Sequence, residues 1–277
     1  MSFGGVVLEN IVDKVFLVTG GAAGIGAGVV RELLLENARY VAFLDIAERE
    51  GLILESELYT KFGALKAKFI KCDISNESEF ADAYKQVFNK YRRIDVVINN
   101  AVVLSADDSD YKRIVDVNLT ATISSTLKAL DYMGIDKGGI GGTVVNVSSL
   151  LALTPKPHLP VYASTKIAVL QFSNSIGAEL FYSKSKVRVL TVCFGPTDTA
   201  ILQKPSISNF DKHFTQSLAS RAPVRQRVKS AAYGMLQVIN NGVSGSTWMI
   251  ANDKSPVDIS ENISGGFNVM SCGIENN

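Results

Sequence analysis

The chain has 277 residues, 47% of them hydrophobic, and 28 basic against 27 acidic side chains give a net charge of +1. This near-neutral balance argues against the basic surface that nucleic acids or anionic membranes attract, so we expect neither as a partner. The length allows one α/β domain with a large core, and the apolar share is typical of a parallel sheet buried on both faces.

Signals for membranes, export and metals are missing. No apolar run reaches the roughly 18–20 residues of a membrane span. Residues 1–14 lack the basic start and apolar run of a signal peptide. Cys72, Cys193 and Cys272 are few and widely spaced, which indicates a reducing compartment, and we expect the cytoplasm. With only His158 and His213 and no Cys/His cluster, we expect no metal site.

The first expected strand, 15–18, is followed at once by a glycine-rich turn, TGGAAGIG at 19–26, and then by a helical pattern. Glycines let the backbone approach a pyrophosphate, and the N-terminus of the following helix favours its negative charge. The spacing departs from the G-x-G-x-x-G fingerprint, and the glycines could equally serve only a tight turn.

The second strand, expected at 40–44, ends at Asp45. An acid about 20 residues past the glycine turn is placed to accept hydrogen bonds from ribose hydroxyls, and it would repel a 2′-phosphate. No Arg or Lys directly follows Asp45, and none lies between Gly21 and Gly24. The pattern therefore predicts NAD rather than NADP. An ordinary strand-end Asp is the competing interpretation.

The middle of the chain holds two further polar candidates. After a helix at 48–62 and a third strand at 67–70, Asp73 could bond an adenine amino group or cap the next helix. Asn118 lies inside a helical stretch expected over 106–133, where an Asn costs a few tenths of a kcal/mol relative to Ala. Its presence indicates a polar task, unless it is exposed to solvent.

The segment 149–166 carries the candidate chemistry. Ser149 closes an expected buried strand, and Tyr162 and Lys166 stand one turn apart on the helix that follows. An ammonium near a phenol lowers the phenol pKa, which suits a general acid or base. The serine hydroxyl could hold the oxygen of an alcohol or ketone, and Ser148 is a rival for this role. A Tyr–Lys pair alone is more often a solvated helix face.

The remaining elements are a fourth strand at 94–98 before Asn99-Asn100-Ala101, a strand at 143–148, a sixth at 187–193, a helix at 227–240 and a seventh strand at 246–250. Residues at about 200–225 have apolar side chains at partly helical spacing, which fits a substrate lid or a surface helix equally. The tail 256–277 is weakly patterned, and we expect it to be loose.

In this order, the motifs resemble the short-chain dehydrogenase/reductase family over roughly 12–250. They are TGGAAGIG at 19–26, Asp45, Asp73, NNA at 99–101, Asn118, Ser149, YASTK at 162–166 and Thr199. GPTDTAIL at 195–202 and GSTWMI at 245–250 are similar to insect alcohol dehydrogenases and NAD-dependent 15-hydroxyprostaglandin dehydrogenases. The resemblance implies one Rossmann-type domain over 1–277, a doubly wound α/β sheet of seven mainly parallel strands with helices on both faces.

The resemblance also implies roles. Tyr162 would be the acid/base and Ser149 would hold the substrate oxygen. Lys166 would bind the nicotinamide ribose and lower the tyrosine pKa. Asn118 would support a water-linked proton path, and Thr199 would contact the carboxamide. The implied NAD-binding residues are Thr19, Gly20, Gly24, Ile25, Gly26, Asp45, Ile46, Asp73, Ile74, Asn100, Ala101, Tyr162, Lys166, Gly195, Thr197 and Thr199.

Two positions depart from the family pattern. Val102 replaces the usual glycine after NNA, and Phe194 replaces the usual proline after the sixth strand, with Pro196 following Gly195. The first change could crowd the adenosine side, and the second could alter the contact of Thr199.

The expected function is NAD-dependent interconversion of an alcohol, primary or secondary, and its carbonyl. The apolar lid and His158 indicate a lipophilic substrate. By resemblance, the chain forms a homodimer or homotetramer through the helices that hold Asn118 and Tyr162. Two alternatives remain: a reductase of steroid or fatty ketones, and a catalytically weak dinucleotide-binding protein that acts by interaction.

Overall fold

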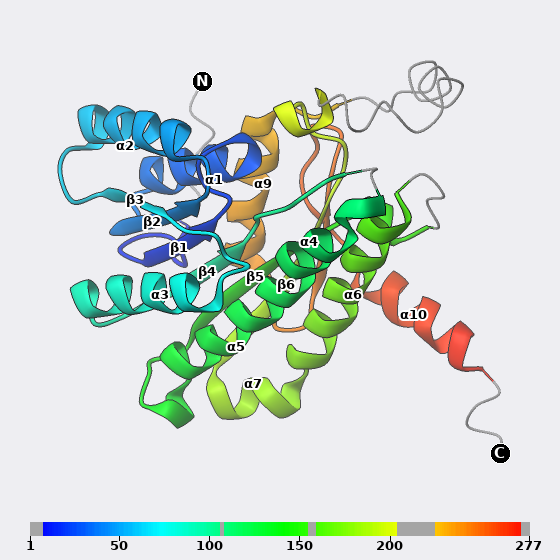
Figure 1. The fold of residues 1–277 in the computed structure, drawn as a ribbon. Coiled ribbons are helices and arrows are strands. Elements are labelled where there is room, and N and C mark those ends of the chain that lie inside the picture. The colour runs from blue at the N-terminus through cyan, green and yellow to red at the C-terminus, as the bar shows by residue number, and fades with distance from the viewer. Residues whose placement is uncertain (1–7, 106–107, 155–158, 204–224, 273–277) are drawn as a thin grey trace.

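The computed structural model describes residues 8–105, 108–154, 159–203 and 225–272. At its centre lies one sheet of eight strands in the order β3-β2-β1-β4-β5-β6-β7-β8 (Figure 1). Neighbouring strands run parallel, except that β8 is antiparallel to β7. The strand order reverses between β1 and β4. In doubly wound sheets, ligands bind at the carboxyl ends of the strands beside such a reversal.

The strands are β1 (Val15–Thr19), β2 (Tyr40–Asp45), β3 (Ala67–Lys71), β4 (Val96–Asn99), β5 (Gly142–Ser149), β6 (Val187–Phe194), β7 (Thr247–Ile250) and β8 (Val257–Asp258). The longer helices are α1 (Gly24–Leu35), α2 (Glu48–Phe62), α3 (Glu77–Tyr91), α5 (Ala121–Met133), α6 (Pro160–Ile176), α9 (Val228–Asn241) and α10 (Ser260–Ser271). Shorter ones are α4 (Tyr111–Val115), α7 (Glu179–Ser185), the π-helical turn η2 (Asp116–Thr120), and the 3₁₀ turns η1 (Asp108–Asp110), η3 (Ile135–Lys137), η4 (Leu150–Ala152) and η5 (Ala200–Gln203). The doubly wound α/β fold expected from the sequence is confirmed, with an eighth strand added at one edge.

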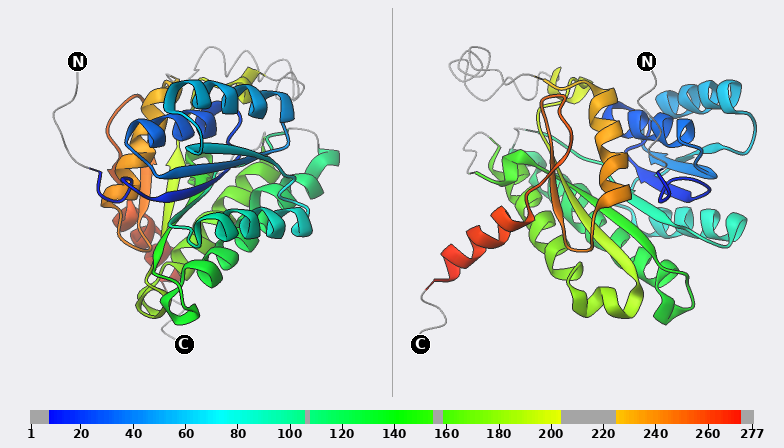
Figure 2. Two further views of the ribbon diagram at one scale, coloured as in Figure 1. Left: turned by 90° about the vertical axis from the view of Figure 1, so that its left-hand side faces the viewer. Right: turned by 180° about the vertical axis from the view of Figure 1, so that it is seen from behind.

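Helices cover both faces of the sheet (Figures 1 and 2). On one face, α1, α2 and α9 pack against Phe16 and Val18 of β1. On the other, α3 and α5 pack against Val15 and Leu17 of the same strand. Because both sides of β1 are buried, its sequence is a continuous apolar run and not an alternating one. No helix in the described ranges is long and apolar enough to cross a membrane.

The stretch expected to be helical over 106–133 is helical throughout its described part, 108–133, where η1, α4, the π turn η2 and α5 follow one another directly. The tail is not loose up to residue 272. Val257 pairs with Met249 to form β8, and α10 follows, with no buried residue. This last helix projects from the body of the molecule in Figure 1 and in the right view of Figure 2.

Candidate active site

The glycine-rich turn between β1 and α1 is a cradle without room for side chains. Gly20 and Gly24 have positive φ angles of 64° and 52°, a region that favours glycine. A Cβ on Gly26 would lie 2.0 Å from the carbonyl oxygen of Gly20, and a Cβ on Gly20 would lie 2.7 Å from Ala101 Cα. Among the described residues no side chain caps α1, so its N-terminus faces the cradle as a site for an anion, with Ile25 in its first turn.

Thr19 and Asn100 connect this turn to the end of β4. The hydroxyl of Thr19 accepts hydrogen bonds from the amides of Asn100 and Ala101, both at 3.0 Å. Asn100 Nδ2 donates to the carbonyls of Thr19 and Gly20, at 3.0 and 3.1 Å. These predicted cofactor-binding residues therefore fix the shape of the turn.

Asp45 lies beside the same turn, at the end of β2. Its Oδ2 accepts from the amide of Ala22 at 3.1 Å, and its Oδ1 accepts from that of Ala47 at 3.0 Å. Each carboxylate oxygen keeps lone pairs for a ribose hydroxyl. The next residue, Ile46, is 54% exposed and offers an apolar surface beside the carboxylate.

The alternative roles of Asp73 can be partly separated. Asn76 caps α3, since its side chain accepts from the amides of Ser78 and Glu79. Asp73 Oδ1 instead accepts from the amide and hydroxyl of Ser75, at 3.0 and 2.6 Å, and these bonds lower the pKa of the carboxyl. The cap is thus a different residue, and the adenine contacts of Asp73 and the half-buried Ile74 stay predictions.

Asn118 is fully buried in the π turn η2. Its Oδ1 accepts from the amide of Val103 at 2.8 Å, and its Nδ2 donates to the Val103 carbonyl at 2.9 Å. Nδ2 also lies 3.3 Å from the hydroxyl of Thr165, the residue before Lys166. π turns often mark functional positions in helices. The polar task indicated by the sequence is therefore a clamp on the chain after β4, and the proton path stays a prediction.

Ser149, Tyr162 and Lys166 meet at the end of β5. The Ser149 hydroxyl lies close enough to the phenol of Tyr162 to lower its pKa, and Lys166 Nζ lies 5.8 Å from the centre of the tyrosine ring. Lys166 is held by Val147 and Ser148, the two residues that precede Ser149 on β5. Its Nζ donates to the Val147 carbonyl at 2.9 Å, and its own carbonyl accepts from Ser148 Oγ at 2.7 Å. Of the two rival serines, Ser149 is the one that contacts the phenol.

Burial shifts the pKa of both titratable groups at this point. It raises the pKa of Tyr162, whose side chain is half-buried, to about 12, although the neighbouring Ser149 hydroxyl acts in the opposite direction. It lowers the pKa of Lys166 to about 8. The Tyr–Lys spacing alone predicted a lowered phenol pKa, but the ammonium is bonded to the Val147 carbonyl and burial dominates. At neutral pH the phenol is therefore protonated.

The loop after β6 runs from the sheet to the glycine turn. The amide of Gly195 donates to the Ile250 carbonyl at 2.9 Å, and Thr197 Oγ1 donates to the Gly195 carbonyl at 3.0 Å. Thr199 Oγ1 lies 3.3 Å from the Thr197 carbonyl. A Cβ on Gly24 would lie 3.2 Å from Thr199 Cγ2, so this loop and the glycine turn form adjoining walls.

Gln226, which the sequence analysis missed, is fully buried and donates through Nε2 to Thr197 Oγ1 at 3.0 Å. Two arginines flank it in the sequence, and such a polar segment is typical of an exposed loop. No pattern marks it as a residue of the site, because its burial depends on contacts with distant strands.

The two departures from the family pattern have visible consequences. Phe194 continues β6 by one residue, paired with Ser149 on one side and Ile250 on the other, and its ring lies in the core. Pro196, displaced from the usual position, uses its carbonyl to accept from the amide of Gln226 at 2.9 Å. Val102 is half-buried, next to the residue that Asn118 clamps.

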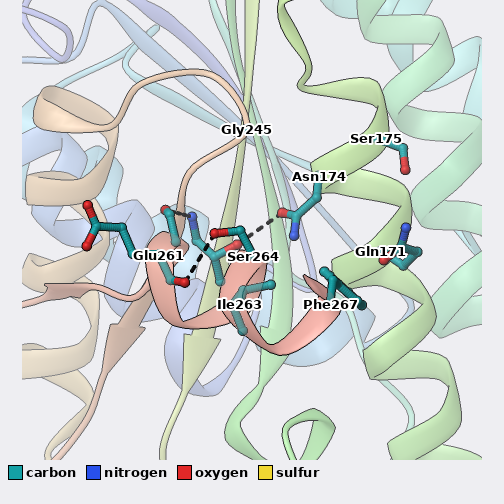
Figure 3. Close-up of a pocket in the computed structure, with 10 residues that line it drawn as sticks. Gln171, Asn174, Ser175, Gly245, Glu261, Ile263, Ser264 and Phe267 are labelled. Atoms are coloured by element: carbon teal, nitrogen blue, oxygen red, sulfur yellow. Dashed lines mark hydrogen bonds between the residues drawn. The ribbon is translucent and has the colours of Figure 1, made fainter. Parts of the chain in front are cut away.

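A separate cavity of about 420 Å³ lies between α6 and α10 (Figure 3). It is lined by Gln171, Asn174, Ser175, Gly245, Thr247, Ser260, Glu261, Ile263, Ser264 and Phe267. Asn174 lies twelve positions after Tyr162 on α6, about 18 Å along a helix, so this cavity is not part of the site. Thr247 donates to Asn174 Oδ1 at 3.0 Å through its hydroxyl and to Ser260 Oγ at 2.9 Å through its amide, which ties the start of α10 to the sheet.

The structure thus brings the predicted catalytic set to one edge of the sheet, between Asp45 on one side and the loop 195–199 on the other. The cradle, the helix N-terminus and the strand-end carboxylate fit a dinucleotide. Most of the substrate lid expected at about 200–225 lies outside the described residues. His158, which the sequence analysis connects with a lipophilic substrate, also lies outside them.

Comparison with known proteins agrees with this geometry. The family model described as short chain dehydrogenase matches residues 14–208. Human 15-hydroxyprostaglandin dehydrogenase [NAD(+)] is 33% identical over 236 residues, which cover 84% of this chain and 86% of the relative. The mouse protein of that name is 35% identical over 194 residues, covering 70% and 71%, and alcohol dehydrogenase 2 of Ceratitis cosyra is 32% identical over 189 residues, covering 68% and 71%. Fold, site and sequence similarity agree, and the protein belongs to the short-chain dehydrogenase family.

Proposed function

We propose that the protein is an NAD-dependent dehydrogenase that interconverts a lipophilic primary or secondary alcohol and its carbonyl. The observation that carries this proposal is the juxtaposition of Ser149, Tyr162 and Lys166 at the same sheet edge as the glycine cradle. NAD is favoured over NADP by Asp45, whose carboxylate would repel a 2′-phosphate. The names of the relatives, with NAD(+) and a hydroxylated substrate in them, support the same choice.

When bound, the nicotinamide would accept or return a hydride. The chain supplies the position and the proton transfer. Ser149 Oγ would hold the substrate oxygen next to the Tyr162 hydroxyl, which exchanges a proton with it. The Gly20–Gly26 turn and the N-terminus of α1 would hold the phosphates. Lys166, whose lowered pKa keeps its proton easily released, would lie between the phenol and the ribose.

The raised pKa of Tyr162 gives weight to a second function, carbonyl reduction. A phenol that is protonated at neutral pH is a proton donor, which reduction of a ketone requires, whereas alcohol oxidation requires a phenolate. The two directions predict different pH profiles. Oxidation should accelerate as pH rises toward the phenol pKa, and reduction should be fastest at neutral pH and below.

The test is substitution of the phenol. Tyr162→Phe should lower kcat by roughly 10²–10⁴-fold, the usual contribution of general acid–base catalysis, and leave NAD binding within about twofold of the wild type. Tyr182→Phe, on α7, is the matched control and should change neither quantity. Rates would be measured with NAD and NADH on a panel of alcohols and ketones, and binding by calorimetry. A fully active Tyr162→Phe would refute the assignment. A wild type that binds NAD but turns over none of the panel would favour the interaction-protein alternative.

We propose in addition that the whole chain acts as one cytoplasmic catalytic domain and associates into a homodimer or homotetramer through α5 and α6. Leu127 on α5 and Ile167 on α6 are 46% and 39% exposed, which supports an apolar contact there. Cys72 and Cys193 are buried and free, as a reducing compartment allows. A monomeric mass in light scattering would contradict the assembly.

A further inference from the structure

Gln226 is the centre of a buried hydrogen-bond cluster that the proposed reaction does not use directly. Its side chain is fully buried, and Nε2 donates to Thr197 Oγ1 and to the carbonyl of Ile250, both at 3.0 Å. Its backbone forms a bridge to the same loop. The amide donates to the Pro196 carbonyl, and the carbonyl accepts from the amide of Asp198, both at 2.9 Å.

The residue after Gln226 fixes this cluster from outside the loop. The amide and Nε of Arg227 donate to the two oxygens of Asp253 at 2.8 and 2.9 Å. Asp253 lies between β7 and β8, so the position of Gln226 is set by the edge of the sheet. Arg225, on the other side, has only a long and exposed ion pair with Asp198, at 3.8 Å, and such pairs contribute little.

The stability of the core alone does not explain a glutamine at this position. Its Oε1 has no hydrogen-bond partner among the described residues, although the atom is buried. An unsatisfied buried acceptor is unfavourable, and a methionine of similar length would avoid it. The two donated bonds are therefore the feature that sets glutamine apart from an apolar residue here.

The loop that Gln226 holds lies on the same side of the glycine turn as the candidate catalytic residues. Ser149 and Phe194 are neighbours across β5 and β6, so residues 195–199 begin beside the catalytic serine. Asp45 lies on the opposite side of the glycine turn, at the end of β2. In the proposed function the nicotinamide must lie next to Tyr162, and hence on the side of this loop, with adenosine on the side of Asp45.

We infer that Gln226 is a positioning residue for the nicotinamide half of NAD. It sets Thr197, and through it Thr199, against the glycine turn, and it does not touch the reacting atoms. This inference rests on the proposed function, and it adds that the nicotinamide half of NAD depends on Gln226 whereas the adenosine half does not. Loss of the two donated bonds should weaken the grip on the nicotinamide half alone.

The test compares two ligands by calorimetry. NAD contains nicotinamide, whereas ADP-ribose keeps both phosphates and both riboses without it. Gln226→Met should weaken NAD binding about tenfold, equivalent to about 1.4 kcal/mol, and change the affinity for ADP-ribose less than about twofold. Gln237→Met, on the partly buried face of α9, is the matched control and should change neither. A general structural role would weaken both ligands equally.

A second variant removes the acceptor of the hydrogen bond from Gln226 to Thr197. Thr197→Val keeps the shape of the side chain and removes the oxygen, so it should show the same selective loss and serves if Gln226→Met does not fold. Equal loss of both ligands in the folded variants, or no loss, would overturn the inference. A wild type that binds neither NAD nor ADP-ribose would instead overturn the proposed function.

Discussion

Replacing Lys166 by methionine should make the protein more stable, because the lysine is buried at an energetic cost. The variant should also be inactive, because the proposed reaction uses this lysine. Its side chain is nearly inaccessible, at 2% exposure, and burial lowers its pKa from 10.5 to about 8. That difference corresponds to about 3 kcal/mol by which the charged form is disfavoured in the native state. Methionine avoids this cost but leaves the Val147 carbonyl without the ammonium, a loss of roughly 1–3 kcal/mol. At pH 7 the net gain is therefore at most about 2 kcal/mol.

The pH dependence is the sharper part of this prediction. Below pH 8 the folded and unfolded chains both bind the lysine proton, so the full cost is present. Between pH 8 and 10.5 the unfolded chain binds more protons than the folded one, and the stability of the wild type rises with pH. The gain between pH 7 and 9 is roughly 1 kcal/mol. Burial raises the pKa values of the Cys72 and Cys193 thiols, which acts in the opposite direction from about pH 8 upward, but this contribution is common to the wild type and the variant and cancels in their difference.

Urea unfolding at pH 7, 8 and 9 measures the difference in free energy of unfolding between Lys166→Met and the wild type. The difference should shrink by roughly 1 kcal/mol across this range, since only the wild type gains stability. Lys184→Met, at an exposed position of α7, should give a difference that does not vary with pH. If the Lys166→Met difference is equally flat, the ammonium is not penalised by burial and the reasoning fails.

Two further predictions concern the cofactor cradle. Gly26→Ala should lower the free energy of unfolding by about 1–3 kcal/mol and weaken NAD binding, because the new Cβ would meet the Gly20 carbonyl oxygen at 2.0 Å. Gly265→Ala, inside α10 with nothing within 4 Å of the added atom, should instead stabilise the protein by about 0.5–1 kcal/mol. If urea unfolding shows changes of the same sign for Gly26→Ala and Gly265→Ala, the packing argument is wrong. Asp45→Ala should raise the ratio of kcat/KM for NADP to that for NAD at least tenfold, as repulsion of the 2′-phosphate is removed. An unchanged ratio in steady-state kinetics would show that Asp45 does not discriminate between NAD and NADP and only forms hydrogen bonds to the turn.

The sheet and the grouping of the candidate site residues at its carboxyl end were predictable because each strand end carries its own local signal. Apolar runs bounded by Thr19, Asp45 and Ser149 mark both the strand and the point where it reaches the cofactor edge. Since these strands are parallel, their ends come together without further information. The prediction that Ser149, Tyr162 and Lys166 share one site needed the whole motif series as well, because a Tyr–Lys pair alone is more often a solvated helix face.

Features that depend on distant contacts were not predictable. The π turn at Asn118 coincides with a pair of bonds to Val103, which no helical pattern reveals. The direction of the Tyr162 pKa follows from burial and not from its spacing to Lys166. Gln226 is fixed by Thr197 and by the edge strand, and α10 follows a strand pair too short to show periodicity.

The contacts of β5 with α6 make the assembly of the candidate site depend on the register of β5 in the sheet. Val147, Ser148 and Ser149 are consecutive: the first two form hydrogen bonds with Lys166, and Ser149 lies beside the phenol of Tyr162. Because side chains alternate between faces, a slip of one position would present the wrong serine to the phenol and release the lysine together. With the proposed catalytic roles, a chain in the wrong register would thus be inert and not partly active, so recovery of turnover during refolding would report when the central strand pairing is correct.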